Sequence, residues 1–199
     1  MLRPSLLARL IFSSLAGLHC AHAQAPQYTG QFIESTTQAH VYALSPSGVA
    51  VGWLDQAGFQ RAWVGGVGQS LTVLPLPAGS DASIAYGINA SGVICGVHGT
   101  AFSIDSPALW VPSGAGTYAF VPLALLSGAT VGAATAINDL GDVVGWSGSG
   151  ADARMTLFSA PGGPLEVGSG VPSAINNQRV LVFLGGGTFS PKRLDLNTL

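Results

Sequence analysis

Residues 137–146 read Ile-Asn-Asp-Leu-Gly-Asp-Val-Val-Gly-Trp, and this pattern recurs along the chain. Related stretches lie at 44–53 and 88–96, and a more divergent copy lies at 175–183. The first glycine of the pattern is Gly48, Gly92 and Gly141 in three of the copies. Arg179 stands at the same position in the divergent copy. Self-similarity at a period of roughly 20–50 residues is the signature of repeat architectures, so the repeat decides the fold.

Each copy has the features of a β-hairpin. Apolar Ile137 ends one strand, and Asn138 starts the turn, because Asn and Ser side chains bond to the backbone two residues on. Gly141 supplies the positive φ that closes such a turn. An apolar run follows as the second strand, and its closing Gly145 leaves room for a neighbouring backbone or a bulge. Arg179 lacks the freedom of glycine, so the fourth turn must be built differently or strained.

Two further apolar segments follow each hairpin. The first carries an aromatic residue, which is Trp63, Trp110 or Phe158, and the second is shorter. Each repeat thus holds four short strands in about 40–45 residues, which is the size of a propeller blade. Sustained 3.6-residue periodicity is absent from the sequence, so almost no helix is expected. The sequence predicts an all-β, β-propeller-like array of four-stranded antiparallel blades.

The repeat resembles a known family. Residues 85–96 and 134–145 follow the pattern A-x-x-I-N-x-x-G-x-V-V-G, the first with Ile and Cys in place of the two valines. Together with the Ala/Leu/Trp strand and the Gly-rich connector, this pattern resembles the HAF-type extracellular repeat family of bacteria over nearly all of residues 38–184. The His-Ala-Phe triplet of that family is not intact, and residues 61–63 are the closest match. The resemblance implies secretion and a β-propeller-like fold, and it carries over no catalytic residues.

The first 23 residues have the features of a secretory signal peptide. Arg3 and Arg9 give a positive start, residues 10–18 form a short apolar run, and residues 21–23 form a small-x-small cleavage site. The apolar run is far shorter than the roughly 20 residues that span a bilayer. Cleavage after Ala23 is expected, and the chain is then secreted or periplasmic.

Two alternatives concern this segment. Cleavage after Ala25 would use residues 23–25 in the same way. A lipoprotein would use Cys20 as its lipidated residue, but His19 stands where a small residue is expected.

Residues 24–199 are expected to form a single repeat domain. Its units span about 38–82, 83–132 and 133–171, and the fourth combines 172–199 with 24–37. The segment 28–33 reads as a strand, and we expect it to complete the fourth blade and latch the ring, which would remove exposed edges. The alternative is that the chain is a fragment of a larger propeller.

Composition excludes several classes of partner. Only 8% of residues are charged, against about 25% in typical soluble domains. The formal net charge is −2 and the sequence has no basic cluster, which argues against nucleic acid as a partner. After the signal peptide, no apolar run is long enough to span a membrane.

Isolated residues with reactive side chains do not form a recognisable site. His40 and His98 lack neighbouring carboxylates in the sequence, whereas metal sites gather several ligands. Cys95 lies in an apolar segment without a base or a cation, which indicates a core residue. Ser149 departs from the G-x-S-x-G pattern and indicates a loop. Asn89 fits a glycosylation sequon, but a turn explains it equally well.

Acidic and aromatic residues give two weaker hypotheses. Asn138, Asp139 and Asp142 cluster at a turn, but a calcium loop needs more oxygen ligands. The tryptophans recur in pairs, Trp53 with Trp146 and Trp63 with Trp110, at what the sequence presents as equivalent positions. Such repetition favours packing between blades, and stacking on carbohydrate is the functional alternative.

The sequence therefore assigns no catalytic, cofactor-binding or metal-ligating residues and no cofactor. The leading hypothesis is a secreted, non-enzymatic repeat protein that binds a carbohydrate or a protein. The first alternative is a secreted hydrolase or lyase with carboxylates in a propeller channel, for which Asp139, Asp142 and Asp152 are the candidate cluster. The second is a structural protein of an extracellular matrix, since a fold alone does not choose among functions.

Overall fold

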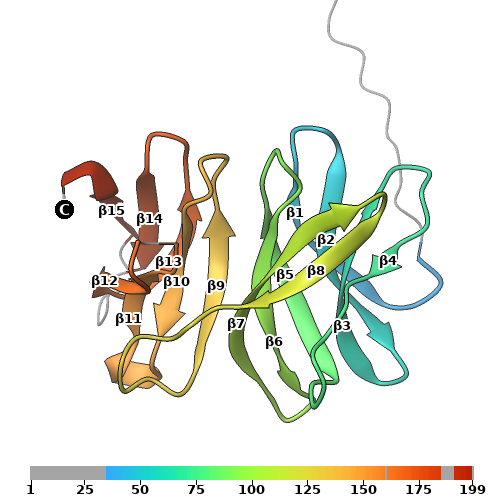
Figure 1. Cartoon of the computed structure of the whole chain (residues 1–199), viewed down its shortest axis with the longest axis horizontal. Helices are drawn as coiled ribbons and strands as arrows, with labels where there is room; N and C mark the ends of the chain where they lie inside the picture. Colours follow the sequence, from blue (N-terminus) through green and yellow to red (C-terminus); the bar gives the residue numbers. More distant parts are fainter. Residues whose placement is uncertain (1–34, 160, 185–190, 199) are drawn as a thin grey trace, which may run out of the picture. The chain divides into compact units, whose positions relative to one another are not determined.

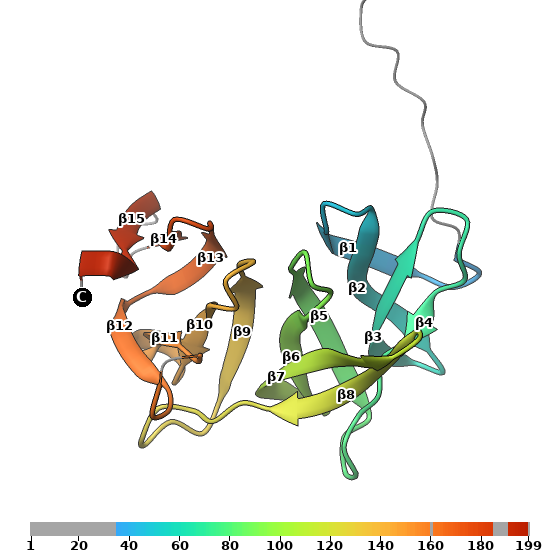
Figure 2. The ribbon, with the colours of Figure 1, turned by 45° about the horizontal axis from the view of Figure 1, so that its top comes forward.

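The computed structural model describes residues 35–159, 161–184 and 191–198, and it confirms an all-β fold. Its strands form four small antiparallel sheets, arranged as the blades of a four-blade β-propeller. In each sheet the strands pair in chain order, and Figures 1 and 2 show the sheets following one another along the chain. The predicted signal peptide, 1–23, and the predicted latch strand, 28–33, lie outside the described residues.

The blades are numbered in chain order. Blade 1 contains β1 (Ala39–Leu44), β2 (Val49–Gln56), β3 (Phe59–Gly66) and β4 (Thr72–Val73). Blade 2 contains β5 (Ala82–Ile88), β6 (Ile94–Thr100), β7 (Ser103–Gly114) and β8 (Thr117–Pro122). Blade 3 contains β9 (Gly132–Ile137), β10 (Val143–Ser147), β11 (Arg154–Leu157) and β12 (Leu165–Ser169), with the 3-10 segment η1 (Gly150–Asp152) after β10. Blade 4 contains β13 (Val171–Ile175), β14 (Val180–Leu184) and β15 (Pro191–Asp195), followed by η2 (Leu196–Thr198).

The core lies between consecutive blades. One apolar cluster joins blade 1 to blade 2, a second joins blade 2 to blade 3, and a third joins blade 3 to blade 4. In each case the first strand of the later blade packs across the earlier one, as β5 does on β2 and β3. Burial of apolar faces between neighbouring blades is the main stabilising contribution of such repeats.

A β-bulge recurs in the first strand of every blade. The unpaired residues are Tyr42, Tyr86, Thr135 and Ser173. In blades 1 to 3, the closing glycine of the repeat pairs with the residue before this bulge, and a Cβ on Gly52 would stand 1.8 Å from the carbonyl oxygen of His40. Equivalent approaches of 2.1 Å and 1.9 Å occur at Gly96 and Gly145. The structure therefore confirms that the closing glycine makes room for a neighbouring backbone.

The fourth turn is strained rather than rebuilt. Arg179 has φ of 62°, in the region that glycine occupies in the other three turns. The backbone N–H of Arg179 still donates to the Asn176 carbonyl at 3.0 Å, just as Gly141 donates to Asn138 at 3.2 Å. A positive φ at a residue with a Cβ costs about 1–2 kcal/mol.

The register corrects one expectation about the tryptophans. Trp63 pairs with Gly52, whereas the residue paired with the equivalent Gly96 is Ala108. Trp110 lies two residues further along its strand, opposite Ile94. The two tryptophans are therefore not equivalent, because the sequence spacing conceals a longer β6–β7 hairpin with a bulge.

Candidate functional site

The four repeat turns lie at the same end of their blades, at the top of Figure 1. They join β1 to β2, β5 to β6, β9 to β10 and β13 to β14. We call this end the turn face, and it consists of residues 45–48, 89–92, 138–142 and 176–179. It contains the densest set of polar side-chain contacts in the described part of the chain, so it is the candidate site.

The first residue of each turn closes that turn with its side chain. Asn89 Oδ1 accepts a hydrogen bond from the N–H of Val93 at 2.9 Å, and Asn138 Oδ1 accepts one from Asp142 at 2.8 Å. In blade 1, Ser45 Oγ accepts one from Val49 at 3.1 Å. These bonds confirm the Asx-type turn that the sequence predicts.

The same asparagines also tie consecutive blades together. Asn89 Nδ2 donates to the carbonyl of Asn138 at 3.2 Å, and Asn138 Nδ2 donates to the carbonyl of Asn176 at 3.0 Å. Asn89 and Asn138 are buried, which strengthens such bonds and makes their loss costly. Sequence reasoning missed this role, although asparagine recurs at one position in blades 2, 3 and 4.

A second set of contacts runs along the outside of the turns. Asp139 Oδ1 accepts the N–H of Ala90 at 2.7 Å, and Asp139 Oδ2 accepts Asn177 Nδ2 at 2.8 Å. Asn177 Oδ1 in turn accepts the N–H of Asp139 at 2.9 Å. The hydrogen bonds from Asn177 and then from Ala90 lower the pKa of Asp139, because both stabilise the charged carboxylate.

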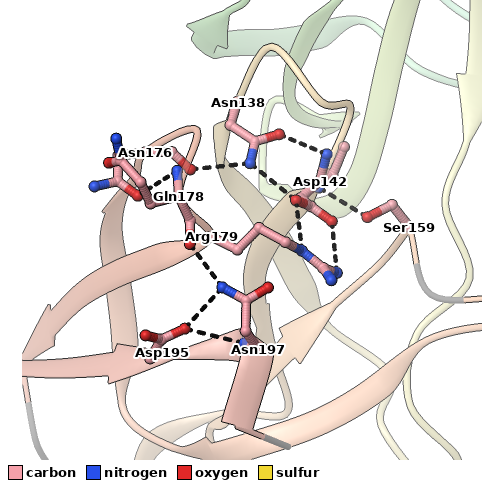
Figure 3. A network of polar contacts seen from close by, with 9 residues as sticks. Asn138, Asp142, Ser159, Asn176, Gln178, Arg179, Asp195 and Asn197 are labelled. Carbon is pink, nitrogen blue, oxygen red and sulfur yellow. Dashed lines mark hydrogen bonds and ion pairs between the residues drawn. The ribbon is translucent and has the colours of Figure 1, made fainter.

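Asp142 and Arg179 form a bidentate ion pair between blades 3 and 4. Arg179 Nε and Nη2 each donate to one carboxylate oxygen of Asp142 at 3.0 Å (Figure 3). Asn138 Nδ2 donates to the same carboxylate at 2.9 Å. The arginine that strains the fourth turn therefore supplies a charge-assisted contact that glycine could not make.

The expected acidic cluster is not a cluster. Asp139 and Asp142 lie on the turn before β10, whereas Asp152 lies in η1 after β10, at the other end of the strand. Asp152 instead borders a depression of about 470 Å³ with Arg154 and Ser127. The three carboxylates are close in the sequence, but strand β10 lies between Asp142 and Asp152 and separates Asp152 from the other two. Within the described residues, no group of three His, Cys, Asp or Glu side chains could hold a metal ion.

The other reactive side chains are dispersed. His40 stacks on Trp53 with ring centroids 4.4 Å apart, and His98 Nδ1 lies 2.9 Å from Ser80 Oγ. Burial lowers the pKa of His98. Cys95 is fully buried and its thiol pKa is raised to about 12, which confirms a core residue. Ser149 lies in the loop between β10 and η1, as predicted.

The tryptophans divide by burial. Trp63 and Trp110 are fully buried, and Trp110 Nε1 donates to the carbonyl of Pro75 in the preceding blade at 2.7 Å. This contact confirms a packing role between blades for Trp110. Trp53 and Trp146 occupy equivalent positions, one residue after the closing glycine, and are half-buried.

The fold and the site together define an all-β repeat protein of the β-propeller class, in which asparagine and aspartate side chains link the blade turns. Comparison with models of known protein families and with curated proteins finds no match for the chain. In the described residues, no helix has the length and apolar character required to cross a membrane.

Proposed function

We propose that this protein is a secreted, non-enzymatic repeat protein that acts as a binding module, with the turn face as its binding surface. The observation that carries this proposal is how the polar groups of that face are used. Asp139, Asp142 and Asn138 are engaged with groups of the neighbouring blade, so they hold the turns in place instead of presenting free acids or bases. A site held rigid before binding loses less entropy when a ligand arrives.

An exposed apolar side chain supplies contact surface. Leu140, at the tip of the blade 3 turn, is 64% exposed. A rigid polar frame with a projecting apolar side chain suits a protein or carbohydrate ligand. Trp53 and Trp146 are half-buried within β2 and β10, outside the turn face, and they do not contribute to this contact surface.

The cellular location belongs to the same proposal. The pattern of residues 1–23 and the likeness of residues 85–96 and 134–145 to HAF-type repeats support export and a place in that family. Export is tested by expression of the full chain in a bacterial host, followed by mass measurement of the exported protein. A mature N-terminus at Gln24 is expected, and retention of the intact chain in the cytoplasm would contradict export.

Ligand binding is tested on a glycan and peptide array with residues 24–199. We expect the wild-type protein to bind, and Leu140→Ser to bind at least about tenfold more weakly. Phe102→Ser is the matched control, because Phe102 is fully exposed in the turn between β6 and β7 at the opposite end of blade 2. Cleavage of the arrayed glycans, seen as new products by mass spectrometry, would favour the hydrolase or lyase instead.

A further inference from the structure

Each interior blade buries two faces. On the trailing face, the side that packs on the next blade, Val51 of blade 1 meets Ala85 and Ile88 of blade 2. Cys95 then meets Ala134 of blade 3 in the same way. Ala85, Ile88 and Ala134 belong to the leading face, which packs on the preceding blade. The repeat thus defines which positions need a neighbouring blade to be covered.

At the two ends of the array, these positions are exposed. Val41 and Leu44 in β1 correspond to Ala85 and Ile88 by strand register, but they are 57% and 65% exposed, against 0% and 8%. Val182 in β14 corresponds to Val51 and is 45% exposed, against 0%. Blade 1 therefore has an open leading face at β1, and blade 4 has an open trailing face at β14.

Part of the leading face of blade 1 is already covered from within that blade. Ala50 and Trp63 are buried, and they pack with Ala39, Leu71 and Val73. The open portion is thus the outer part of β1, centred on Val41 and Leu44. A partner blade has to reach this strand, as β2 and β3 reach β5 at the interface of blades 1 and 2.

We propose that the trailing face of blade 4 packs on the leading face of blade 1 of a second copy of this chain. Val182 would then meet Val41 and Leu44, as Val51 meets Ala85 and Ile88 within one chain. The polar contacts can continue as well, since Asn176 occupies the position of Asn89 and Asn138 and would donate its Nδ2 to the carbonyl of Ser45. Every group in this contact has its counterpart in an interface that the chain already makes.

The symmetry of the contact limits the size of the assembly. A head-to-tail contact between different faces must close into a ring or grow into a filament. Two copies of the four described blades give eight, which is within the roughly four to eight blades typical of propellers, whereas three copies exceed that range. The proposed assembly is therefore a closed dimer with two identical interfaces.

The test uses two charge substitutions in residues 24–199. Analytical ultracentrifugation of the wild-type protein is expected to show a dimer. Val182→Glu and Val41→Lys each place an unpaired charge in both interfaces, so each variant alone is expected to be a monomer, with dimerisation weakened about 100-fold or more. Phe102→Glu is the control, since it adds a charge at a fully exposed position away from both faces and should leave the dimer intact.

Mixing the two variants separates this geometry from others. In the mixed dimer, one interface pairs the introduced carboxylate with the introduced ammonium, and the other interface is wild type, so the dimer should return. A monomeric wild-type protein would overturn the proposal and point to coverage of these faces from within one chain. Loss of the dimer in only one variant, or a mixture that stays monomeric, would overturn the head-to-tail contact. Circular dichroism checks that both variants keep the β fold.

Discussion

At the scale of single residues, backbone crowding explains the closing glycine of the first three blades. The turn glycine and the closing glycine serve different purposes. Gly48 has φ of 82° and open space around it, whereas Gly52 faces the carbonyl of His40 in β1. Arg179 shows that the turn position tolerates a side chain at a moderate cost. In blades 1 to 3 a backbone carbonyl lies where a Cβ on the closing glycine would stand, whereas blade 4 has Phe183 at that position, paired with Pro172.

This difference predicts unequal effects of alanine at the two glycines. Gly48→Ala should lower the free energy of unfolding by about 1 kcal/mol, since only the positive φ is disfavoured. Gly52→Ala should lower it by more than about 3 kcal/mol, because the new Cβ would overlap the carbonyl of His40 and the strand pair would have to separate. Urea unfolding followed by tryptophan fluorescence measures both. Equal losses would show that crowding at the bulge is not the reason for Gly52.

Arg179 carries two opposing contributions that two substitutions separate. Arg179→Ala keeps the positive φ and loses the ion pair with Asp142, so stability should fall by about 2 kcal/mol. Arg179→Gly loses the same pair but relieves the backbone, so it should be about 1 kcal/mol more stable than the alanine variant. Thermal unfolding in low salt compares them. A glycine variant less stable than the alanine variant would contradict the assignment of strain to this turn.

At the scale of elements, the hairpin turns determine how the blades hold together. Asn89 and Asn138 form what we call the asparagine ladder, since each closes its own turn with its side-chain oxygen and donates its side-chain nitrogen to the next blade. Blade 1 has Ser45 and Pro46 at the corresponding positions, so the ladder begins at blade 2. The contact between blades 1 and 2 combines apolar packing with two hydrogen bonds, from Trp110 Nε1 to the Pro75 carbonyl and from the N–H of Ala62 to Ser83 Oγ.

The ladder predicts a large cost for Asn138→Ala. The substitution leaves the half-buried N–H of Asp142 without its acceptor and removes the donors to Asn176 and to the Asp142 carboxylate, so we expect a loss of about 3 kcal/mol. Asn177→Ala is the control, because its contacts with Asp139 are exposed and should contribute less than about 1 kcal/mol. Chemical denaturation of the two variants provides the comparison. Similar losses of unfolding free energy in the two variants would mean that burial of the asparagine contacts adds nothing to stability.

At the scale of the whole molecule, stability is distributed unevenly because repeat proteins gain their stability from neighbour contacts. Blades 2 and 3 are covered on both faces, whereas blades 1 and 4 each have a neighbour on one face within the described chain. The end blades are consequently expected to open at lower free energy than the interior ones.

Hydrogen exchange tests this distribution. Amides in β6 and β10 should exchange most slowly, and amides in β1 and β14 should exchange faster at low protein concentration. If the end faces meet in a dimer, protection of β1 and β14 should rise with protein concentration, while that of β6 and β10 changes less. Uniform protection across the four blades, independent of concentration, would contradict the picture of open end faces.

Much of the local structure follows from the sequence alone. Asn138, Gly141 and Gly145 each have a conformational role set by the residue type within one hairpin, so the hairpins, the blade size and the all-β class could be predicted. For the same reason the sequence predicted a fourth turn that is either built differently or strained at Arg179, and the structure shows the strained form. The burial of Cys95 followed from its apolar neighbours. These properties depend on contacts between residues close together in the chain.

The tertiary structure alone decided which distant residues meet. Asp152 is separated from Asp139 and Asp142 because β10 lies between them. The number of residues between two side chains does not by itself reveal at which end of a strand each of them lies. Trp63 and Trp110 differ by two positions because one hairpin is longer than the other. The link from Asn89 through Asn138 to Asn176 exists only when three blades lie side by side. Sequence determines the turn, and packing determines what the turn touches.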